Sequence, residues 1–510
     1  MYASLRALCC ACAVRISVAA LMLLVSAGTA QSLEFANADE ERAALRRGQE
    51  LFERTWKVER RGDGQGDGLG PLFNERSCVA CHMQGGIGGA GPLSKNVDVL
   101  SVITKAERRG PSARRLATLH PGFASGSPTV LHRFNRASPG YDAARGKLLG
   151  IKMLPEGDHL YAQLPIEEGR DQRVMEPYRN LKYGDIKLLW TARNTTPLFG
   201  AGLIELIQPS VLEQVAAQQT REDPEVTGRL YGRFGWRGQM KTLGSFVRGA
   251  CEAEMGLTPE PSPAVNNAAA GGALVNEAVQ VGPPPRFDIS DDECNAMTAF
   301  VASLPAPRRV EPTDAEEQLR VKHGEAVFAK IGCAVCHRPT LASVSGIYSD
   351  LLLHDMGLSL ADPLASPQPD PPQIQDPPVR TVPGYYGSIA TPTTRQPSPG
   401  EMQVFRQEWK TPPLWGVRDS GPYLHDGRAS TIEEAVGWHG GEALRSARKF
   451  ANMSKSDRAD VLAFLMTLAA PCPADLPPRI ALDESAGAEM TDEKPWPRPA
   501  EVVHYQAGKP

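Results

Sequence analysis

The stretch Cys333-Ala334-Val335-Cys336-His337 decides the fold, and Cys78-Val79-Ala80-Cys81-His82 repeats its pattern. Two cysteines two residues apart, followed at once by histidine, form the c-type haem attachment pattern. The thiols bond the haem vinyl groups and the histidine ligates the iron. A redox CxxC pair or half of a zinc site is the alternative. Two copies, without further Cys/His pairs at zinc spacing, favour haem, so the sequence predicts two covalently bound c-type haems ligated by His82 and His337.

A glycine–phenylalanine pattern precedes both motifs. Gly48-Gln49-Glu50-Leu51-Phe52 lies ahead of the first motif, and Gly324-Glu325-Ala326-Val327-Phe328 lies ahead of the second. Each segment has the apolar spacing of an amphipathic helix. We expect this helix to be the N-terminal helix of a cytochrome c domain.

Two later segments repeat in the same order, which indicates an internal duplication. Residues 195–200 (TTPLFG) correspond to 411–416 (TPPLWG), and residues 290–304 correspond to 454–468. In the last pair, Ser is followed three residues later by an acid, and then by apolar residues at helical spacing. This pattern predicts a capped amphipathic helix. We expect it to pack on the helix that carries the Gly-x-x-x-Phe pattern.

The predicted fold is mainly α: two cytochrome c-like haem domains related by internal duplication, with long loops and inserts. Little strand is expected, and stretches rich in Pro, Gly, Asn or Ala predict irregular loops. The expected divisions are a first domain at 37–305 with inserts near 105–190 and 220–288, a second domain at 311–472, loops at 259–285 and 363–400, and a polar Pro-rich tail at 473–510.

Residues 1–30 have the pattern of a cleaved secretory signal peptide. Arg6 and Arg15 form the positive n-region, residues 16–25 form an apolar h-region, and small residues at 27–30 suit signal peptidase. An uncleaved anchor is disfavoured because nothing apolar extends the short run. No later stretch reaches transmembrane length, so we expect a periplasmic protein with no stable membrane span.

The charge balance excludes one class of partner. The formal net charge is −4, and removing the signal peptide takes away two Arg and no acid, which gives −6. This mild acidity argues against nucleic acid as a partner. It gives slight support for a basic redox partner.

Three cysteines remain outside the signal peptide and the two motifs: Cys251, Cys294 and Cys472. An exported protein permits one disulfide among them. Cys251–Cys294 is the preferred pairing, and the third thiol is then buried or free.

Longer stretches of the chain carry a family resemblance. The segments are YSDLLLHDMG (348–357), EWKTPPLWGV (408–417), GPYLHDGR (421–428) and TIEEAVGWHGGE (431–442), with DGLGPLFN (67–74) and PLFGAGLIE (197–205) in the first half. They resemble the bacterial di-haem cytochrome c peroxidase superfamily, which includes the di-haem enzyme of tryptophan tryptophylquinone maturation. The chain looks most like its di-haem thiol oxidoreductase or peroxidase branch.

The resemblance suggests the distal ligand of the second haem. In the peroxidases, a distal Met follows the His of the Pro-Tyr-x-His-Asp-Gly segment by fourteen residues. Here that His is His425, and position 439 is His. We therefore expect His439 to ligate the haem on Cys333 and Cys336, with His425 close by and not a ligand; the alternative is a pocket or surface histidine. Imidazole in place of thioether lowers the reduction potential.

The haem on Cys78 and Cys81 lacks an obvious distal partner. His120, His132 and His159 are candidates in polar contexts, and Met83 adjoins the proximal histidine and cannot reach the distal face. An open iron position would be the reactive one.

The resemblance implies a distal Glu at that open position, which moves a proton between the peroxide oxygens. Glu205 is the first candidate and Glu213 the second; the alternative is a solvated helix carboxylate.

Two further site expectations follow from the resemblance. Trp409, Trp415 and Trp438 cluster in the motifs of the second half and would either relay electrons or pack against porphyrin, the commoner role. A calcium ion occurs between the domains in the superfamily, and Ser420 and the carbonyl of Pro422 match two of its ligand positions.

Three functions remain open at this point. The first is a peroxidase-like oxidoreductase, in which a small redox carrier of cytochrome c or cupredoxin type donates electrons at the C-terminal haem and hydrogen peroxide or another small substrate reacts at the N-terminal haem. The second is a non-catalytic electron-transfer cytochrome with two six-coordinate irons. The third is oxidation of a sulfur compound or a protein side chain.

Overall fold

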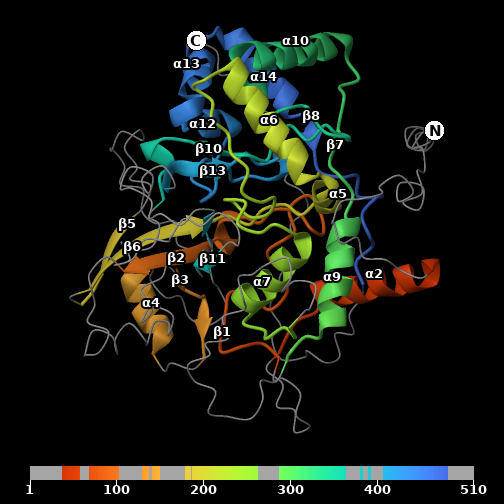
Figure 1. Ribbon diagram of the computed structural model, residues 1–510, viewed down its shortest axis with the longest axis vertical. Coiled ribbons are helices and arrows are strands. Elements are labelled where there is room, and N and C mark those ends of the chain that lie inside the picture. Colours follow the sequence, from red (N-terminus) through yellow and green to blue (C-terminus); the bar gives the residue numbers. More distant parts are fainter. Residues whose placement is uncertain are drawn as a thin grey trace, which may run out of the picture. The chain divides into compact units, whose positions relative to one another are not determined.

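Helices predominate in the computed structural model of this chain (Figure 1). The structure describes residues 37–57, 68–102, 129–136, 140–149, 179–184, 186–261, 287–362, 380–382, 389–391 and 406–480. Its α-helices are α2 (Ala38–Glu53), α4 (Tyr141–Leu149), α5 (Ala201–Leu206), α6 (Pro209–Glu222), α7 (Leu243–Met255), α9 (Asp291–Ser303), α10 (Ala315–Ile331), α12 (Ile432–Gly437), α13 (Leu444–Asn452) and α14 (Lys455–Leu465). Short 3-10 helices lie at Leu93–Lys95 (η2), Cys333–Val335 (η6), Leu358–Leu360 (η7), Val417–Asp419 (η8) and Gly441–Ala443 (η9).

The two predicted capped helices are confirmed. Ser290 is the N-cap of α9, and its side chain and that of Glu293 form a reciprocal capping box. Ser454 is the N-cap of α14, where its side chain accepts from the backbone N–H of Asp457. These bonds satisfy N–H groups that have no partner within a helix, so both helices begin where the sequence predicts.

These helices form two equivalent pairs, α2 with α9 and α10 with α14. At Gly48, a Cβ atom would lie 2.1 Å from the Ala296 carbonyl oxygen, and at Gly324 it would lie 1.9 Å from that of Asp460. Only glycine permits backbones to approach so closely. In both pairs, a phenylalanine follows this glycine by four residues and contacts a phenylalanine of the partner helix, at 5.4 Å for Phe52–Phe300 and 5.5 Å for Phe328–Phe464.

A four-stranded antiparallel sheet corrects the expectation of little strand. Its strands, in the order β3-β2-β6-β5, are β3 (Thr129–Val130), β2 (Val97–Val102), β6 (Ile186–Arg193) and β5 (Arg179–Tyr183). The sheet lies largely in the insert predicted at 105–190. Apolar side chains of these strands and of α4, including Leu100, Leu188 and Tyr141, form their own buried cluster.

The other strands are short antiparallel pairs. They are β1 (Leu72–Phe73) with β4 (Phe134–Asn135), β7 (Arg308–Arg309) with β14 (Leu468–Ala469), β8 (Thr340–Leu341) with β9 (Val344–Ser345), β10 (Leu353–Asp355) with β13 (Glu408–Lys410), and β11 (Arg380–Val382) with β12 (Ile389–Thr391). The β10–β13 pair sets His354 opposite Trp409. The β11–β12 pair lies within 363–400, which was predicted to be irregular.

Two further apolar clusters lie beneath the helix pairs. The larger includes Phe52 and Phe300 and extends across the chain to Trp415. The second is centred on Phe328 and Phe464. Helix α7, within the insert expected at 220–288, packs on α9 and supplies buried Val247 to the larger cluster.

The halves of the chain contact each other directly. The indole of Trp415 lies against Gly200, where a Cβ atom would be 2.7 Å from the ring. Asn194 donates its backbone N–H to the His425 carbonyl at 2.8 Å. All described residues belong to one compact unit.

Several predictions lie outside the described residues: the signal peptide, most of the 259–285 loop, and the tail beyond residue 480. Among the helices of the described part, none is both long and apolar enough to cross a bilayer.

Candidate haem sites

The first motif is a tight turn after α2. His82 donates its backbone N–H to the Cys78 carbonyl at 3.0 Å, and its Nδ1 lies 3.2 Å from the Gly89 carbonyl oxygen. Desolvation lowers the pKa of His82 to about 4, so the ring is neutral near pH 7. A neutral ring that donates from Nδ1 has Nε2 as its acceptor, as an iron ligand requires; the backbone of Thr196 also lies close enough to this ring to raise its pKa against desolvation.

The second motif has the same construction. Helix α10 ends at Gly332, and η6 carries Cys333 into the turn. His337 donates its backbone N–H to the Cys333 carbonyl at 2.9 Å, and its Nδ1 lies 3.0 Å from the Tyr348 carbonyl oxygen. Desolvation lowers the pKa of His337 to about 4. The two predicted proximal histidines are therefore oriented alike by backbone carbonyls.

Burial raises the pKa of all four motif thiols, to about 12 for Cys78 and Cys333. Thiols of this kind are protonated near pH 7 and are poor thiolate nucleophiles or metal ligands. Their environment disfavours the alternative of an active CxxC redox pair.

His439 faces the second motif. Its ring centroid lies 6.4 Å from that of His337, and the two planes are inclined by 49°. Metal–imidazole bonds are about 2 Å long, and each ring centre lies roughly 1 Å beyond its nitrogen, so two axial imidazoles on one metal have centroids about 6 Å apart. His439 Nδ1 lies 2.7 Å from the Ala435 carbonyl oxygen. No described residue hydrogen-bonds Nε2 of either ring, so this pair fits bis-histidine ligation of haem iron.

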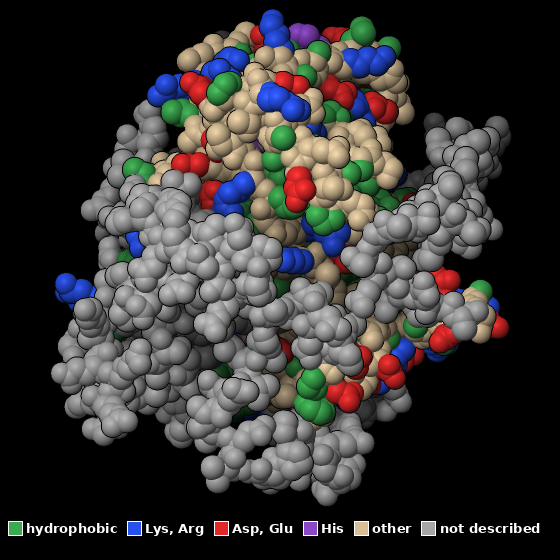
Figure 2. Space-filling model, in the orientation of Figure 1, with side chains coloured by type: hydrophobic (Ala, Val, Ile, Leu, Met, Phe, Trp, Pro, Cys, Tyr) green, Lys and Arg blue, Asp and Glu red, His purple; other side chains and the backbone are tan. Residues whose placement is uncertain are grey.

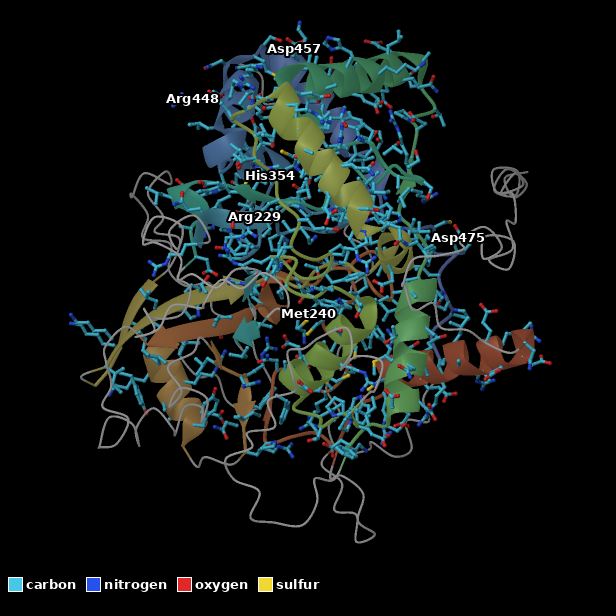
Figure 3. The ribbon with its side chains drawn as sticks, viewed as in Figure 1. Arg229, Met240, His354, Arg448, Asp457 and Asp475 are labelled. Atoms are coloured by element: carbon cyan, nitrogen blue, oxygen red, sulfur yellow. The ribbon has the colours of Figure 1, made fainter. Side chains whose placement is uncertain are left out.

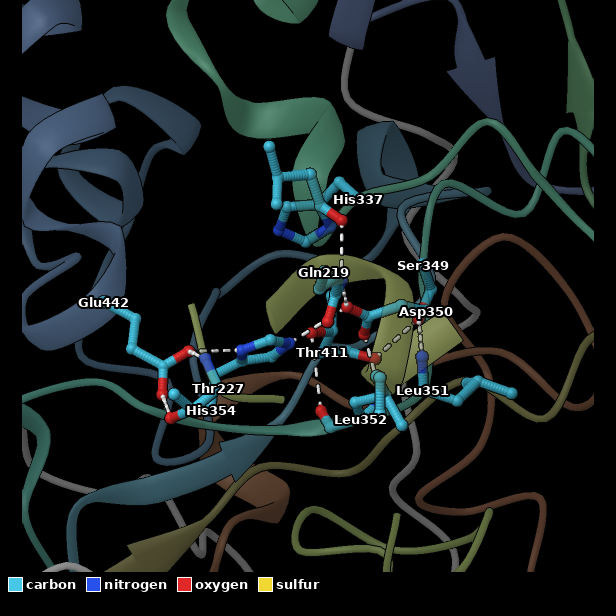
Figure 4. A network of polar contacts seen from close by, with 12 residues as sticks. Gln219, Thr227, His337, Ser349, Asp350, Leu351, Leu352, His354, Thr411 and Glu442 are labelled. Atoms are coloured by element: carbon cyan, nitrogen blue, oxygen red, sulfur yellow. Dashed lines mark hydrogen bonds and ion pairs between the residues drawn. The ribbon is translucent and has the colours of Figure 1, made fainter. Parts of the chain in front are cut away.

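A buried polar network adjoins the second motif (Figure 4). His354 Nε2 lies 2.9 Å from Asp350 Oδ2, and its Nδ1 lies 2.6 Å from Glu442 Oε2. Both neighbours are carboxylates, which only accept when ionised, so the ring donates from both nitrogens as an imidazolium. Hydrogen bonds to these carboxylates raise the pKa of His354 well above its ordinary value despite desolvation.

This network links α6 to the haem-attachment turn. Gln219 donates from Nε2 to Asp350 Oδ2 at 2.6 Å and to the Val335 carbonyl at 2.8 Å. Ligand atoms of Cys336, Asp350 and His354 lie within 4.8 Å of one another. A thioether at Cys336 would remove the thiol from such a metal cluster, so the haem and metal interpretations exclude each other. The sequence analysis assigned no role to Gln219 or His354; an aspartate and a histidine four residues apart were the available signal.

His425 lies where the halves of the chain meet, because its carbonyl accepts the backbone N–H of Asn194 at 2.8 Å. Its buried ring stacks on Trp409 with centroids 3.7 Å apart and planes at 11°. The guanidinium of Arg237 lies 4.0 Å from the same indole. Desolvation, with the charges of Arg428, Arg193 and Arg237, lowers the pKa of His425 well below its ordinary value. Cations beside Trp409 disfavour its oxidation to a radical cation, which argues for packing and against hole relay at this residue.

Trp415 and Trp438 occupy different environments. Trp415 is buried in the larger apolar cluster against Gly200. Trp438 is partly exposed and lies beneath the guanidinium of Arg428 at 5.0 Å. The predicted tryptophan cluster is therefore divided among three places.

Glu205 lies on α5 near the first motif. Leu198 donates its backbone N–H to the Gly88 carbonyl at 2.7 Å, which brings α5 beside the turn that follows His82. Glu205 Oε2 lies 3.3 Å from Arg233 Nη2 and accepts the backbone N–H of Leu243 at 3.1 Å. Burial raises its pKa, and Arg233 opposes the shift. Glu213, the second candidate, is exposed on α6, which argues against a role in a buried distal site.

The other predicted residues are placed as follows. His132 Nε2 lies 2.9 Å from the Ala253 carbonyl oxygen, so its ring contacts α7 backbone. His120 and His159 lie outside the described residues. Cys251 and Cys294 are both buried and free, so the expected disulfide is not formed. Cys472, the third thiol, is also free and only partly buried.

The calcium prediction is untested. Ser420 Oγ donates to the Gly416 carbonyl at 2.7 Å, and the Gly421 carbonyl accepts from Gln84 Nε2 at 2.8 Å. The second of these bonds places the side chain of Gln84, from the first half of the chain, at the loop that contains Pro422.

Comparisons with known proteins match parts of the chain. A family model described as "Di-haem oxidoreductase, putative peroxidase" matches residues 400–468. The methylamine utilization protein MauG of Methylorubrum extorquens is 30% identical over 155 residues, covering 29% of this chain and 34% of that protein. The cytochrome-c peroxidase IdrP2 of a Pseudomonas species (strain SCT) is 28% identical over 160 residues, covering 29% of this chain and 39% of that protein.

These matches show that part of the chain is similar to di-haem oxidoreductases and peroxidases. The chain spans less than two fifths of the length of these two relatives. Among solved structures, the diheme peroxidase BthA from Burkholderia thailandensis E264 is 18% identical, with 47% of this chain and 66% of that chain covered and a TM-score of 0.27. A TM-score of this size carries no argument. The segment that the family model matches, 400–468, contains His425, His439 and α13.

Proposed function

We propose that this chain is an exported, periplasmic di-haem c-type oxidoreductase with peroxidase-like activity. The observation that carries the proposal is the facing pair His337 and His439, at 6.4 Å between ring centroids. Among the described residues, the His82 ring is contacted by the Gly89 carbonyl oxygen at 3.2 Å, by the Thr196 backbone and by the Phe52 ring at 6.2 Å, and no imidazole faces it. We infer that the iron site with two imidazoles transfers electrons. The substrate reacts at the iron site that lacks a second imidazole.

The halves of the chain then have separate roles. Residues 37–305 form the N-terminal haem domain, where the substrate reacts, and residues 311–472 form the C-terminal haem domain, where electrons enter. The equivalent helix pairs α2–α9 and α10–α14 support their origin by duplication, because both have the same glycine contact and the same phenylalanine pair.

Covalent haem fits the donor set of both motifs. The thiols of each motif are held in one turn beside a histidine that turns Nε2 away from its backbone carbonyl partner. Haem bound through Cys78 and Cys81 would supply the iron at which hydrogen peroxide takes up two electrons and, with two protons, becomes two waters. The electrons come one at a time from a small redox carrier protein.

Glu205 is positioned to handle a proton in this reaction. A carboxyl group whose pKa is raised toward neutrality exchanges protons more readily with a bound substrate. Burial supplies that shift, and Arg233 and the Leu243 N–H hold the carboxyl in one orientation. We propose that Glu205 accepts a proton from one peroxide oxygen and returns it to the other.

Glu205→Gln tests this role, with exposed Glu213→Gln as the matched control. We expect peroxide turnover with a small-molecule reductant to fall about 100-fold or more in the first variant. The control should stay within about twofold of wild type, since surface substitutions have small effects. Unchanged oxidised spectra would establish that both variants are folded. Full turnover in Glu205→Gln would contradict the assignment.

One observation favours the second candidate, a non-catalytic electron-transfer cytochrome. Met240, which the sequence analysis did not consider, is partly buried against the apolar cluster that also contacts Cys78 (Figure 3). A thioether ligand there would close the first iron site. Met240→Ala would then convert a low-spin haem to a high-spin one, whereas the peroxidase-like proposal expects no change of spin state.

A further inference from the structure

A basic surface lies on α13, close to the second motif. Leu444, Arg445, Arg448 and Lys449 are all exposed on this helix, Leu444 at 39%. We call these four residues the α13 surface. Arg448 projects from the helix (Figure 3), and Lys and Arg side chains are visible in Figure 2 where Figure 1 places α13.

The charge of this surface is largely uncompensated. Within the described part of the chain, neither Arg448 nor Lys449 makes an ion pair. Arg445 pairs with Asp223 and lies 3.8 Å from Glu225, an acid that is itself 79% exposed. The chain as a whole has a formal charge of −4, so the α13 surface has a charge of opposite sign to the net charge of the chain.

The surface adjoins the haem-attachment turn. At Gly332, the residue before Cys333, a Cβ atom would lie 2.8 Å from Ser446 Oγ of α13. The charge of Lys449 acts on the pKa of the Cys333 thiol, lowering it against the larger effect of burial. Along the chain, α13 begins five residues after His439. Electrons that enter at α13 therefore have a short path to the site of His337 and His439.

The surface also has a hollow and an apolar element. A depression of about 840 Å³ is lined by the apolar Leu444 and Met453, the cationic Arg445, Arg448 and Lys449, the acidic Glu225, Asp355 and Glu442, and Gly441 and Asn452. An apolar element within a polar, charged rim is the usual anatomy of a protein–protein interface. Weak electron-transfer encounters bury little area and depend on charge for their rate.

We propose that the α13 surface docks an acidic one-electron carrier protein, with carboxylates of the carrier against Arg448 and Lys449. This proposal rests on the proposed function, in which electrons enter at the C-terminal haem. In each encounter the carrier is oxidised by one electron and the chain is reduced by one. No bond forms and no proton moves. The net charge of the chain had suggested a basic partner; the local surface indicates an acidic one.

The test uses two carriers of known charge and measures electron transfer without peroxide. The haem-loaded protein is reduced, freed of reductant, and mixed in a stopped-flow instrument with oxidised plastocyanin, an acidic cupredoxin, or with oxidised horse cytochrome c, a basic carrier. Electrons then pass through the same docked complex in the reverse of the proposed direction. The variant is Arg448→Glu/Lys449→Glu. The control is Lys182→Glu/Lys187→Glu, an exposed pair opposite each other in β5 and β6 that makes the same change in net charge.

We expect the wild-type rate with plastocyanin to fall about tenfold or more as ionic strength rises, because salt screens the attraction. The α13 variant should lose roughly tenfold at low ionic strength and become salt-insensitive, and the control should stay within about twofold of wild type. With cytochrome c, the α13 variant should react as fast as wild type or faster.

Equal losses in the variant and the control would overturn the proposal, since net charge alone would then explain them. A salt-independent wild-type rate, or faster reaction of wild type with the basic carrier, would overturn it as well. A different outcome would contradict the proposed function. Normal plastocyanin kinetics without peroxide turnover would contradict the peroxidase-like reaction and would still support docking at the α13 surface.

Discussion

At the scale of single residues, the motif histidines were the most predictable part of the site. Adjacency to CxxC places His82 and His337 in their turns, and fourteen-residue spacing from His425 pointed to His439. The structure brings His337 and His439 face to face with both Nδ1 atoms on backbone carbonyls. Ligation by His439 stays a prediction, but one with a geometry that a substitution can test.

His439→Ala should open one coordination position of the second haem. We expect a low-spin ferric haem to become high-spin, and added imidazole to restore the low-spin spectrum, because the free ligand enters the vacated space. Electron paramagnetic resonance of the oxidised protein measures the change. His323→Ala, which removes a half-exposed histidine of α10, is the control and should leave the spectrum unchanged. A low-spin spectrum in His439→Ala would exclude His439 as a ligand.

The His354 network could not be deduced in the same way. Asp350 and His354 are four residues apart, but Gln219 and Glu442 join them from distant parts of the sequence. Buried ion pairs depend on partners that only the tertiary fold brings together. The sequence offered only the four-residue spacing of Asp350 and His354 as a signal, and the network itself was found in the structure.

The contribution of the His354 network to the free energy of unfolding should decrease both as pH rises and as pH falls. Its pKa is raised in the folded state, so its contribution is complete below the unfolded value near 6.5 and is lost as pH rises through the folded pKa. The pKa values of Asp350 and Glu442 are lowered. Their contribution is present above unfolded values near 3.8 and 4.5 and is lost as pH falls through the folded pKa values.

His354→Gln should therefore lower the free energy of unfolding most between about pH 5 and 6, by about 3–5 kcal/mol. Urea denaturation of wild type and variant across pH 3 to 10 measures the difference. A difference that is constant with pH would show that the ring contributes only packing and hydrogen bonds of fixed strength.

At the scale of elements, the capped helices were predictable and the sheet was not. Ser290 and Ser454 mark helix starts because local side-chain caps determine them. Strands β2 and β6 are separated by over eighty residues and pair only in the folded chain. The four-stranded sheet was missed because β3, β5 and part of β6 lie in the insert at 105–190, for which the sequence analysis predicted no elements, and β2 precedes that insert.

The glycine of each helix pair makes a prediction at this scale. Gly324→Ala should lower the free energy of unfolding by about 1–3 kcal/mol or more, because the new methyl group would lie 1.9 Å from the Asp460 carbonyl oxygen and the helices must separate. Thermal unfolding measures the loss. Gly437→Ala, where no atom lies within 4 Å of the added methyl group, is the matched control. Equal stability of the two variants would contradict the close α10–α14 contact.

At the scale of the whole molecule, the repeated motifs predicted two similar halves but not how closely they contact each other. Gln219 of the first half donates to the second haem-attachment turn, and Trp415 of the second half packs on Gly200 of the first. These contacts join segments without any shared sequence pattern, so duplication alone could not reveal them. We propose that two unlike iron sites lie within this one compact unit.

The optical and electron paramagnetic resonance spectra of the purified oxidised protein, with and without hydrogen peroxide, test this claim most directly. The account predicts one low-spin bis-histidine haem and one high-spin haem, with the high-spin signal changing when peroxide is added. Two low-spin haems that do not respond to peroxide in either the oxidised or the reduced protein would contradict it and leave an electron carrier.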